Sequence, residues 1–492
     1  GDKVTELAFL DQRQRNRGEL TSDNAIVLHP FGRYCNGFKS AGEIDVLEAI
    51  AAVQQHYRID PQRIVIAGFS MGGAGAWHLG AHYAEHWAAV HAGAGFAETS
   101  RYQRLQPQDY PPEYEQTLWR VYDVPNYVRN LFHVPVLAYS GEMDKQIQAA
   151  RVMEEAYQQE GRELAHEIGP GMGHKYHPES LERVERFVHD ALKRGRDSYP
   201  EQITLQTMTL RYPSYHWVKM LGLNEHWKDS RIDAQRYADG RVELATKNVD
   251  AFQVTSPWSD VERFHQAFRL TVDGVMLDVP ADVARQSLTL TRAGDRWQVV
   301  DRFPPAGTLR KVPGLQGPLD DVWLEPFLVV MPSGTCAHRS VTRWVDFELE
   351  HLQDRWRRLF RGEPRVKRDV EVTAEDLQTY HIIVWGDPSS NALLRRAVPE
   401  LPLRWTAEEL SIGERSYDAR EHVPQLIYPN PLSPGKYLVV NSGLTFRENH
   451  DRTNSLQNPK LPDWAVVGLS QDPNSESPGK IEAAGFFNET WQ

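Results

Sequence analysis

A serine between glycines is the residue of this chain best suited to do chemistry. Ser70 lies in the stretch Gly68-Phe-Ser-Met-Gly72, after the β-branched apolar run 64–67 and before a small-residue pattern typical of a helix. The glycines permit a sharp strand-to-helix turn that holds the serine hydroxyl outward. The helix that follows would point free backbone N–H groups at an oxyanion formed there. An ordinary turn has the same composition, but this context predicts a nucleophile at Ser70.

Two later loops contain the groups that a serine nucleophile needs. Asp144 follows the strand-like run 134–140, and His174 lies in a glycine-rich loop after the run 164–168. A serine hydroxyl is a weak nucleophile at neutral pH, so we expect His174 to take its proton. Asp144 would then orient the imidazole and stabilise the imidazolium. The order serine, acid, histidine along the chain is that of an α/β-hydrolase.

Both partners of Ser70 have rivals close by in the sequence. Glu142 could supply the acid in place of Asp144, which by itself could simply cap the next helix, and His177 could replace His174. The glycine-rich approach to His174 favours it over His177. Three candidates in the right order at three strand ends are hard to obtain by chance. We therefore predict the set Ser70, Asp144 and His174.

The elements that would position these residues alternate between strands and helices. Apolar runs predict strands, and apolar residues that recur at helical spacing predict helices between them. The expected strands are 24–30, 64–67, 87–91, 134–140 and 164–168, and the expected helices are 41–56, one from residue 71, and 146–161. This order predicts a parallel sheet with helices on both faces, whose ligands bind at the carboxyl ends of the strands.

Three motifs of this segment are similar to those of one family. The runs 68–77, 140–144 and 173–178 resemble bacterial esterases and peptidases of the prolyl-oligopeptidase-like α/β-hydrolase superfamily, and large multidomain members resemble the chain most closely. The resemblance is specific over residues 24–190 and looser beyond them. It implies an α/β-hydrolase domain, and a location that is secreted or periplasmic.

The resemblance also assigns roles to individual residues. Ser70 would be the nucleophile, Asp144 the acid, His174 the base and the N–H of Met71 one oxyanion donor. We expect no cofactor and no metal ion. The substrate that it implies is a carboxylic ester, such as an acyl group on a plant polysaccharide.

The chain departs from that family before Ser70. In the family's fold the second oxyanion donor comes from a loop after an earlier strand, usually marked by His-Gly, and this sequence has no such strand. The run 24–30 matches the family's next strand better than the strand that precedes the oxyanion loop. The sheet is therefore expected to lack its first strands. We expect these strands upstream of this sequence, or another segment or chain in their place. A missing donor would lower the rate by about two to three orders of magnitude, unless Tyr34 offers its hydroxyl.

Two other features near Ser70 have both a chemical and a structural interpretation. His78 and His82 are one helical turn apart and could bind a metal ion, but no third ligand is evident nearby, so we expect packing or surface histidines. The tyrosine-rich insertion 98–133 could form a lid or an aromatic wall over Ser70. Its alternative is a helical excursion packed on the sheet.

The sequence pattern changes near residue 200. Between residues 203 and 300, short runs alternate in period two and are separated by Asp-Gly turns, which predicts a β-sandwich. Tyr215, Trp217 and Trp227 could stack on sugar rings if they are exposed. We expect them instead to anchor the core of the sandwich, because sandwiches need large apolar side chains there.

Strands and helices alternate again in the last part of the chain. Ser389 follows a strand-like run, but no glycines flank it as they do in an elbow, so we expect its loop to cap a helix. Strands are expected at 327–331, 381–385, 437–441 and 464–468, with an amphipathic helix at 341–359. The predicted organisation is a hydrolase domain at 1–197, a β-sandwich at 198–313 and a second α/β domain at 314–492.

Composition and charge argue against several classes of partner. The 492 residues are 40% hydrophobic and 25% charged, which is typical of a globular chain of several domains. The net charge of −12 argues against nucleic acid or an anionic membrane as a partner, and no run approaches the roughly 18 apolar residues of a membrane span. Cys35 and Cys336 lie far apart in the sequence and are expected to be free thiols.

The function that these patterns favour is that of a serine hydrolase that cleaves a carboxylic ester through an acyl-enzyme. A peptidase of the same mechanism and a non-catalytic binding protein with a relic triad are the alternatives. The preference for an ester substrate over a peptide rests on two observations. One is the family resemblance, and the other is that the sequence lacks the repeated four-stranded pattern of a β-propeller. The expected partner is a small-molecule or polysaccharide ester, and a homo-oligomer or a complementing segment is left open.

Overall fold

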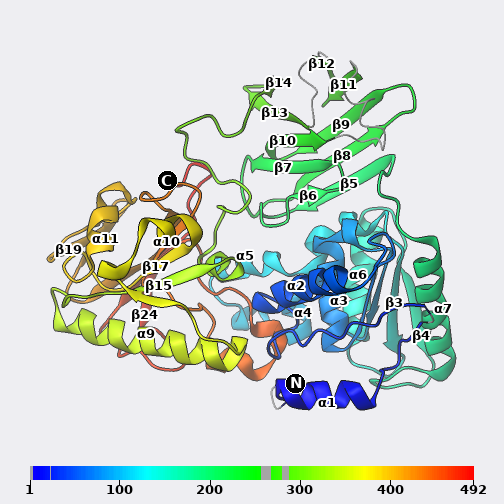
Figure 1. The fold of residues 1–492 in the computed structure, drawn as a ribbon, viewed down its shortest axis with the longest axis horizontal. Coiled ribbons are helices and arrows are strands. Elements are labelled where there is room, and N and C mark those ends of the chain that lie inside the picture. The colour runs from blue at the N-terminus through cyan, green and yellow to red at the C-terminus, as the bar shows by residue number, and fades with distance from the viewer. Residues whose placement is uncertain (1–3, 23, 256–267, 280–286) are drawn as a thin grey trace. The chain divides into compact units, whose positions relative to one another are not determined.

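The computed structural model describes residues 4–22, 24–255, 268–279 and 287–492. The chain divides into two compact units (Figure 1). The first unit consists of Gly1–Lys39, Asp45–Tyr110 and Trp119–Gly314, and the second of Ser40–Ile44, Pro111–Leu118 and Leu315–Gln492. The predicted boundary between residues 197 and 198 stays a prediction, and the predicted sandwich range includes 256–267 and 280–286, which lie outside the described residues.

A four-stranded parallel sheet organises the N-terminal half of the first unit. Its order is the order of the chain, β1-β2-β3-β4. The strands are β1 (Val65–Phe69), β2 (Ala89–Gly93), β3 (Val136–Gly141) and β4 (Ala165–Gly169). Helices α3 (Met71–His82) and α6 (Ile147–Gln159) cover one face, and α7 (Pro178–Arg194) covers the other (Figure 1). The predicted α/β fold class is therefore confirmed.

Apolar side chains between the sheet and α7 hold these layers together. A buried cluster consists of Tyr139 of β3, Val184 of α7, and Tyr176 in the loop before α7. Phe69 of β1 packs against this cluster. On the opposite face α3 is buried along its whole length after its first turn. Small side chains allow a helix to pack closely against a sheet, which explains the run of alanines and glycines after Ser70.

The strand predicted at 24–30 is wrong, because the structure has coil there. Ile26, Val27 and Leu28 are exposed rather than buried in a sheet. The apolar run is short, and Pro30 has no N–H to donate to a neighbouring strand. The described sheet therefore begins with β1, at its edge. The helix predicted after this run is present as α2 (Ala41–His56).

The insertion 98–133 is largely helical. Its elements in the first unit are α4 (Thr99–Gln103), η2 (Pro107–Asp109), η3 (Trp119–Val121) and η4 (Val124–Leu131). The rings of Trp119, Tyr122 and Tyr127 are buried, and the Tyr127 hydroxyl donates to the carbonyl of Arg120 at 2.9 Å. Because η4 packs on α3, these three rings belong to the core, as a packed excursion requires.

We expect Asp123, at the start of η4, to make stability depend on pH. Burial raises the pKa of Asp123 to about 7, although its hydrogen bond from the Thr99 hydroxyl opposes this. Between about pH 4 and pH 7 the folded chain then holds a proton that the unfolded chain has lost. The free energy of unfolding therefore falls as the pH rises through this range, by up to about 1.4 kcal/mol per pH unit.

Urea unfolding of Asp123→Asn at pH 5 and pH 7.5 measures this effect. The variant keeps an oxygen that accepts from Thr99 but cannot ionise, so its stability relative to the wild type should be higher at pH 7.5 than at pH 5. Asp295→Asn, on an exposed turn, is the control and should show equal differences at both values. The prediction fails if Asp123→Asn also gives equal differences.

Two five-stranded sheets follow in the first unit, as the predicted β-sandwich requires. Their orders are β14-β13-β10-β7-β6 and β12-β11-β9-β8-β5. The strands are β5 (Gln202–Thr207), β6 (Ser214–Tyr215), β7 (Val218–Leu223), β8 (Ser230–Arg236), β9 (Arg241–Lys247), β10 (Val249–Thr255), β11 (Phe268–Val272), β12 (Val275–Val279), β13 (Ser287–Ala293) and β14 (Arg296–Val300). Tyr215, Trp217 and Trp227 are all buried. They therefore pack in the core, and cannot stack on a sugar from solvent.

The second unit contains a seven-stranded sheet in the order β16-β15-β17-β22-β21-β23-β24. Its first four strands are parallel. The strands are β15 (Phe327–Met331), β16 (Val366–Arg368), β17 (His381–Val384), β21 (His422–Pro429), β22 (Tyr437–Val440), β23 (Trp464–Gly468) and β24 (Lys480–Gly485). Together with α9 (Arg339–Phe360) they confirm the predicted second α/β segment. No helix among the described residues has the length and apolar composition to cross a bilayer.

The loop around Ser389 caps a helix, as predicted, but a different residue is the cap. Asn391 accepts hydrogen bonds from the N–H groups of Leu393 and Leu394 at the start of α11 (Ala392–Ala397). The N–H of Ser389 donates to Asp387. Neither Cys336, near this loop, nor Cys35, in the first unit, forms a disulfide.

Candidate active site

Ser70 occupies a strained turn between β1 and α3. Its backbone has φ 57° and ψ −117°, a conformation that residues with a side chain rarely adopt. A Cβ atom on Gly68 would lie 2.0 Å from the carbonyl oxygen of Gly72, so only glycine fits there. The N–H of Ser70 donates to the carbonyl of Gly93 at 2.8 Å. The turn is thus fixed by contacts with its own glycines and with the end of β2.

The structure brings Ser70, His174 and Asp144 into one hydrogen-bonded chain. The Oγ atom of Ser70 lies 2.8 Å from Nε2 of His174, and Nδ1 of His174 lies 2.8 Å from Oδ2 of Asp144. The Asp144 side chain is 5% exposed, whereas that of His174 is 40% exposed. A buried carboxylate behind a histidine that faces solvent at the serine is an arrangement that can move a proton from Ser70.

The two loops that hold Asp144 and His174 are tied to each other. The N–H of Met143 donates to the carbonyl of Met172 at 2.8 Å, and a Cβ atom on Gly141 would lie 2.1 Å from the carbonyl oxygen of Gly173. The other oxygen of Asp144, Oδ1, accepts the N–H of Gln146 at 2.9 Å. Each carboxylate oxygen therefore has one donor, which fixes the plane of the carboxylate toward the imidazole.

The rival acid and the rival histidine have other partners. Glu142 accepts the N–H of Gly171 at 2.7 Å and so holds the loop before His174. His177 is the N-cap residue of α7, and its N–H donates to the hydroxyl of Tyr139 at 2.8 Å. These contacts give both rivals a role in loop structure.

Tyr139 is a supporting residue that the sequence did not indicate. Its hydroxyl accepts from the N–H of His177 and donates to the carbonyl of Lys175 at 2.9 Å. The Tyr139 hydroxyl therefore fixes the backbone of the loop that follows His174, on the face of the sheet covered by α7. An aromatic residue in a predicted strand is expected to pack in a core, so only the structure could reveal this contact.

Met71 is the first residue of α3. The first N–H groups of a helix have no carbonyl within the helix to donate to. The predicted role of the Met71 N–H as an oxyanion donor is compatible with this position at the start of the helix. The thiol of Cys35 lies 3.7 Å from the sulfur of Met71. The loop before α2 therefore lies beside Met71.

A second serine, histidine and acid form a similar chain inside the protein. Oγ of Ser140 lies 3.0 Å from Nε2 of His166, and Nδ1 of His166 lies 2.8 Å from Oε1 of Glu154. Burial lowers the pKa of His166, and Glu154 partly offsets this. Ser140 is fully buried, so no substrate can reach its hydroxyl. This chain links β3, β4 and α6 and serves the fold.

Comparison with protein families gives one match. Residues 38–195 match the prolyl oligopeptidase family. The match covers the segment whose motifs resemble the prolyl-oligopeptidase-like α/β-hydrolase superfamily and is consistent with that resemblance. The parallel sheet has the α/β-hydrolase fold. The match includes Ser70, Asp144 and His174. No curated protein matches the chain.

Solved structures match the chain over about a third of its length. A Bacteroides ovatus protein assigned as a dipeptidyl aminopeptidase IV is 16% identical with a TM-score of 0.27, over 32% of this chain and 23% of that one. An S-formylglutathione hydrolase from Agrobacterium tumefaciens is 25% identical with a TM-score of 0.23, over 30% and 53%. The fluorophosphonate-binding serine hydrolase F of Staphylococcus aureus is 17% identical with a TM-score of 0.27, over 32% and 68%. The chain thus covers about a quarter of the first structure and about half of the second.

Proposed function

We propose that this chain is a serine hydrolase that cleaves a carboxylic ester, with Ser70 as nucleophile, His174 as base and Asp144 as the orienting acid. The observation that carries the proposal is the 2.8 Å approach of His174 Nε2 to the Ser70 hydroxyl, at a strained turn before a helix. The same geometry at an ordinary turn would have no need of strain, which costs about 1–3 kcal/mol. The family of residues 38–195 supports the assignment.

The reaction follows from the positions of these atoms. As the Ser70 oxygen attacks the ester carbonyl carbon, its proton passes to Nε2 of His174 and the carbonyl oxygen becomes an oxyanion that the N–H of Met71 stabilises. The imidazolium then donates this proton to the leaving alcohol as the ester bond breaks. Water, deprotonated by His174, attacks the acyl-Ser70 carbonyl, and collapse of the second tetrahedral intermediate returns the proton to Ser70 and releases the acid.

An ester is the preferred substrate class, and a peptide is the second candidate. The name of the matching family favours a peptide. The described strands from residue 202 onward, however, form two five-stranded sheets, a seven-stranded mixed sheet and a three-stranded sheet rather than repeated four-stranded blades, so these strands do not have the pattern of a β-propeller. Acyl groups on plant polysaccharide are the ester that we would test after simple esters.

A direct comparison of substrates tests this proposal. The full chain is mixed with p-nitrophenyl acetate, acetylated polysaccharide and chromogenic prolyl peptides. We expect a burst of about one p-nitrophenol per chain, an acetyl group on Ser70 by mass spectrometry and a higher kcat/KM for esters than for peptides. Higher kcat/KM for peptides would identify a peptidase instead. No acylation by any substrate would favour the binding protein with a relic triad.

A further inference from the structure

A polar cavity lies within the first unit, beside η1 (Ala84–His86). Its volume is about 290 Å³, and its lining comes from η1, from residues 196–199 after α7, from the turn 216–217 between β6 and β7, and from Thr255. Ser70 precedes the 12 residues of α3, whereas η1 follows them. Because α3 is about 18 Å long, the cavity is a site separate from the candidate active site.

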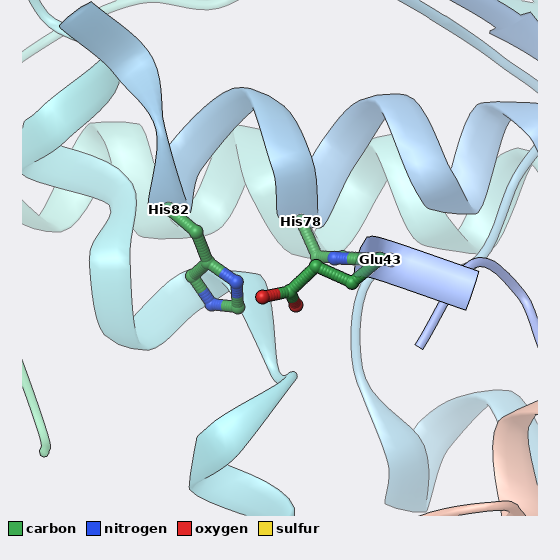
Figure 2. Close-up of side chains that lie close together, drawn as sticks. All are labelled: Glu43, His78 and His82. Atoms are coloured by element: carbon green, nitrogen blue, oxygen red, sulfur yellow. The ribbon is translucent and has the colours of Figure 1, made fainter. Parts of the chain in front are cut away.

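Two contacts hold the walls of this cavity together. Figure 2 shows the side chains of His78 and His82 on the same side of α3, and the ring of His82 stacks on that of Tyr212 with a centroid distance of 3.6 Å. The N–H of His216 donates to Oε2 of Glu85 at 2.5 Å. The end of α3 and the turn between β6 and β7 are thus fixed to each other, so the cavity is bounded by segments that hold their positions.

Arg196 supplies the positive charge of the cavity. Its backbone N–H donates to the carbonyl of Gln62 at 2.8 Å and its Nε to the carbonyl of Pro61 at 3.4 Å, which fixes the base of the guanidinium. In the part of the chain that the structure describes, no carboxylate lies within 4.0 Å of Arg196, and neither of its terminal NH₂ groups has a hydrogen-bond partner. A guanidinium with two free NH₂ groups recognises a carboxylate by a pair of parallel hydrogen bonds.

The turn between β6 and β7 is strained at His216. It is a two-residue loop, in which His216 has φ 52°. Glycine and asparagine are the usual residues at a positive φ in such loops, and residues held in this way cluster at ligand sites. His216 lines the cavity. Burial and the nearby Arg196 lower the pKa of His216 to about 4, so its ring is neutral at pH 7 and has one donor and one acceptor nitrogen.

The other polar groups of the lining favour a ligand with hydroxyl groups. Ser198, Tyr199 and Thr255 each have a hydroxyl that donates and accepts, and Glu85 accepts. Phosphate would satisfy Arg196 but would meet the negative charge of Glu85. An amino acid would bring an ammonium group to Glu85, but an ammonium group cannot accept from the hydroxyls or the imidazole. Hydroxyl groups on a ligand can do both.

We propose that this cavity binds a sugar residue that carries a carboxylate, that is, a hexuronic acid. The carboxylate would pair with the Arg196 guanidinium, and the ring hydroxyls would donate to Glu85 and exchange hydrogen bonds with His216. The volume of about 290 Å³ lies just below the range of roughly 300–1,000 Å³ for small-molecule sites, which suits a single sugar ring.

A uronic acid site at the far end of α3 would hold an acidic polysaccharide on the protein while another part of the same polysaccharide reaches Ser70. That use rests on the proposed hydrolysis of a polysaccharide ester. Binding in the cavity does not rest on it, so the two can be tested apart.

Isothermal titration calorimetry of the full chain at pH 7 tests the site, with sodium glucuronate, glucose, sodium phosphate and free alanine as separate probes. We expect one glucuronate per chain, bound about 10-fold or more tightly than each of the other probes. Arg196→Gln should weaken glucuronate binding by about 10-fold or more, because it removes the charge and the paired donors. His216→Gly should weaken it by about threefold or more without lowering the melting temperature, since glycine adopts a positive φ without strain.

Two further variants are controls. Arg194→Gln removes the same charge from the exposed end of α7 and should bind glucuronate like the wild type. Ser70→Ala should also bind it unchanged, so a chain without hydrolytic activity still tests the cavity. The proposal is overturned if glucuronate does not bind, if glucose, phosphate or alanine binds as tightly, or if folded Arg196→Gln keeps the wild-type affinity. Should Arg196→Gln fail to fold, His216→Gly decides in the same way.

Discussion

Replacement of Ser70 by alanine is expected to abolish covalent labelling by a fluorophosphonate probe and to lower ester turnover by about 10⁴-fold or more. The probe reacts with a serine oxygen only when a base takes the proton. His174 lies at hydrogen-bonding distance from the Ser70 oxygen and can act as that base. The methyl group of alanine occupies less space than the hydroxymethyl group. The free energy of unfolding should therefore change little, which urea unfolding would show.

Ser140→Ala is the matched control for this experiment. Ser140 also contacts a histidine that contacts an acid, but its hydroxyl is buried. Labelling of this variant should equal that of the wild type, because access to solvent and not the hydrogen-bonded chain alone decides reactivity. It should be less stable by about 1 kcal/mol, since His166 loses a partner. Labelling that survives in Ser70→Ala and is lost in Ser140→Ala would overturn the choice of nucleophile.

Local patterns were sufficient to predict the elements that carry the candidate site. The apolar run before Ser70 and the small residues after it are next to each other in sequence, and the structure has β1 and α3 there. The runs before Asp144 and His174 likewise became β3 and β4. Since parallel strands direct their carboxyl ends to one edge of the sheet, the approach of the three residues followed from chain order.

Features that depend on distant contacts could not be predicted in this way. The run 24–30 has the composition of a strand, but a strand also needs a neighbour to donate and accept its backbone hydrogen bonds, and none is present among the described strands.

The two carboxylates of the loop after β3 illustrate the same limit. Glu142 and Asp144 are two residues apart, so sequence position could not decide which of them faces His174. The structure gives them different partners. Glu142 accepts a backbone N–H from the loop of His174, while Asp144 contacts the imidazole itself. This difference predicts different effects of removing each charge.

Asp144→Asn is expected to lower kcat by about 10⁴-fold, because an amide nitrogen facing Nδ1 of His174 would favour the tautomer that carries its proton on Nε2. That tautomer cannot accept the proton of Ser70. The expected loss is in the chemical step, so single-turnover acylation should slow as much as kcat. Fluorophosphonate labelling should slow in parallel.

Glu142→Gln is the matched change, and we expect it to alter kcat less than about threefold. The glutamine oxygen can still accept the N–H of Gly171, whose hydrogen bond to Glu142 is 2.7 Å long, so the loop of His174 keeps its position. If Glu142→Gln instead caused the 10⁴-fold loss and Asp144→Asn the small one, Glu142 would be the acid. Equal large losses would mean that both carboxylates act on His174 together, one through the imidazole and one through the backbone that carries it.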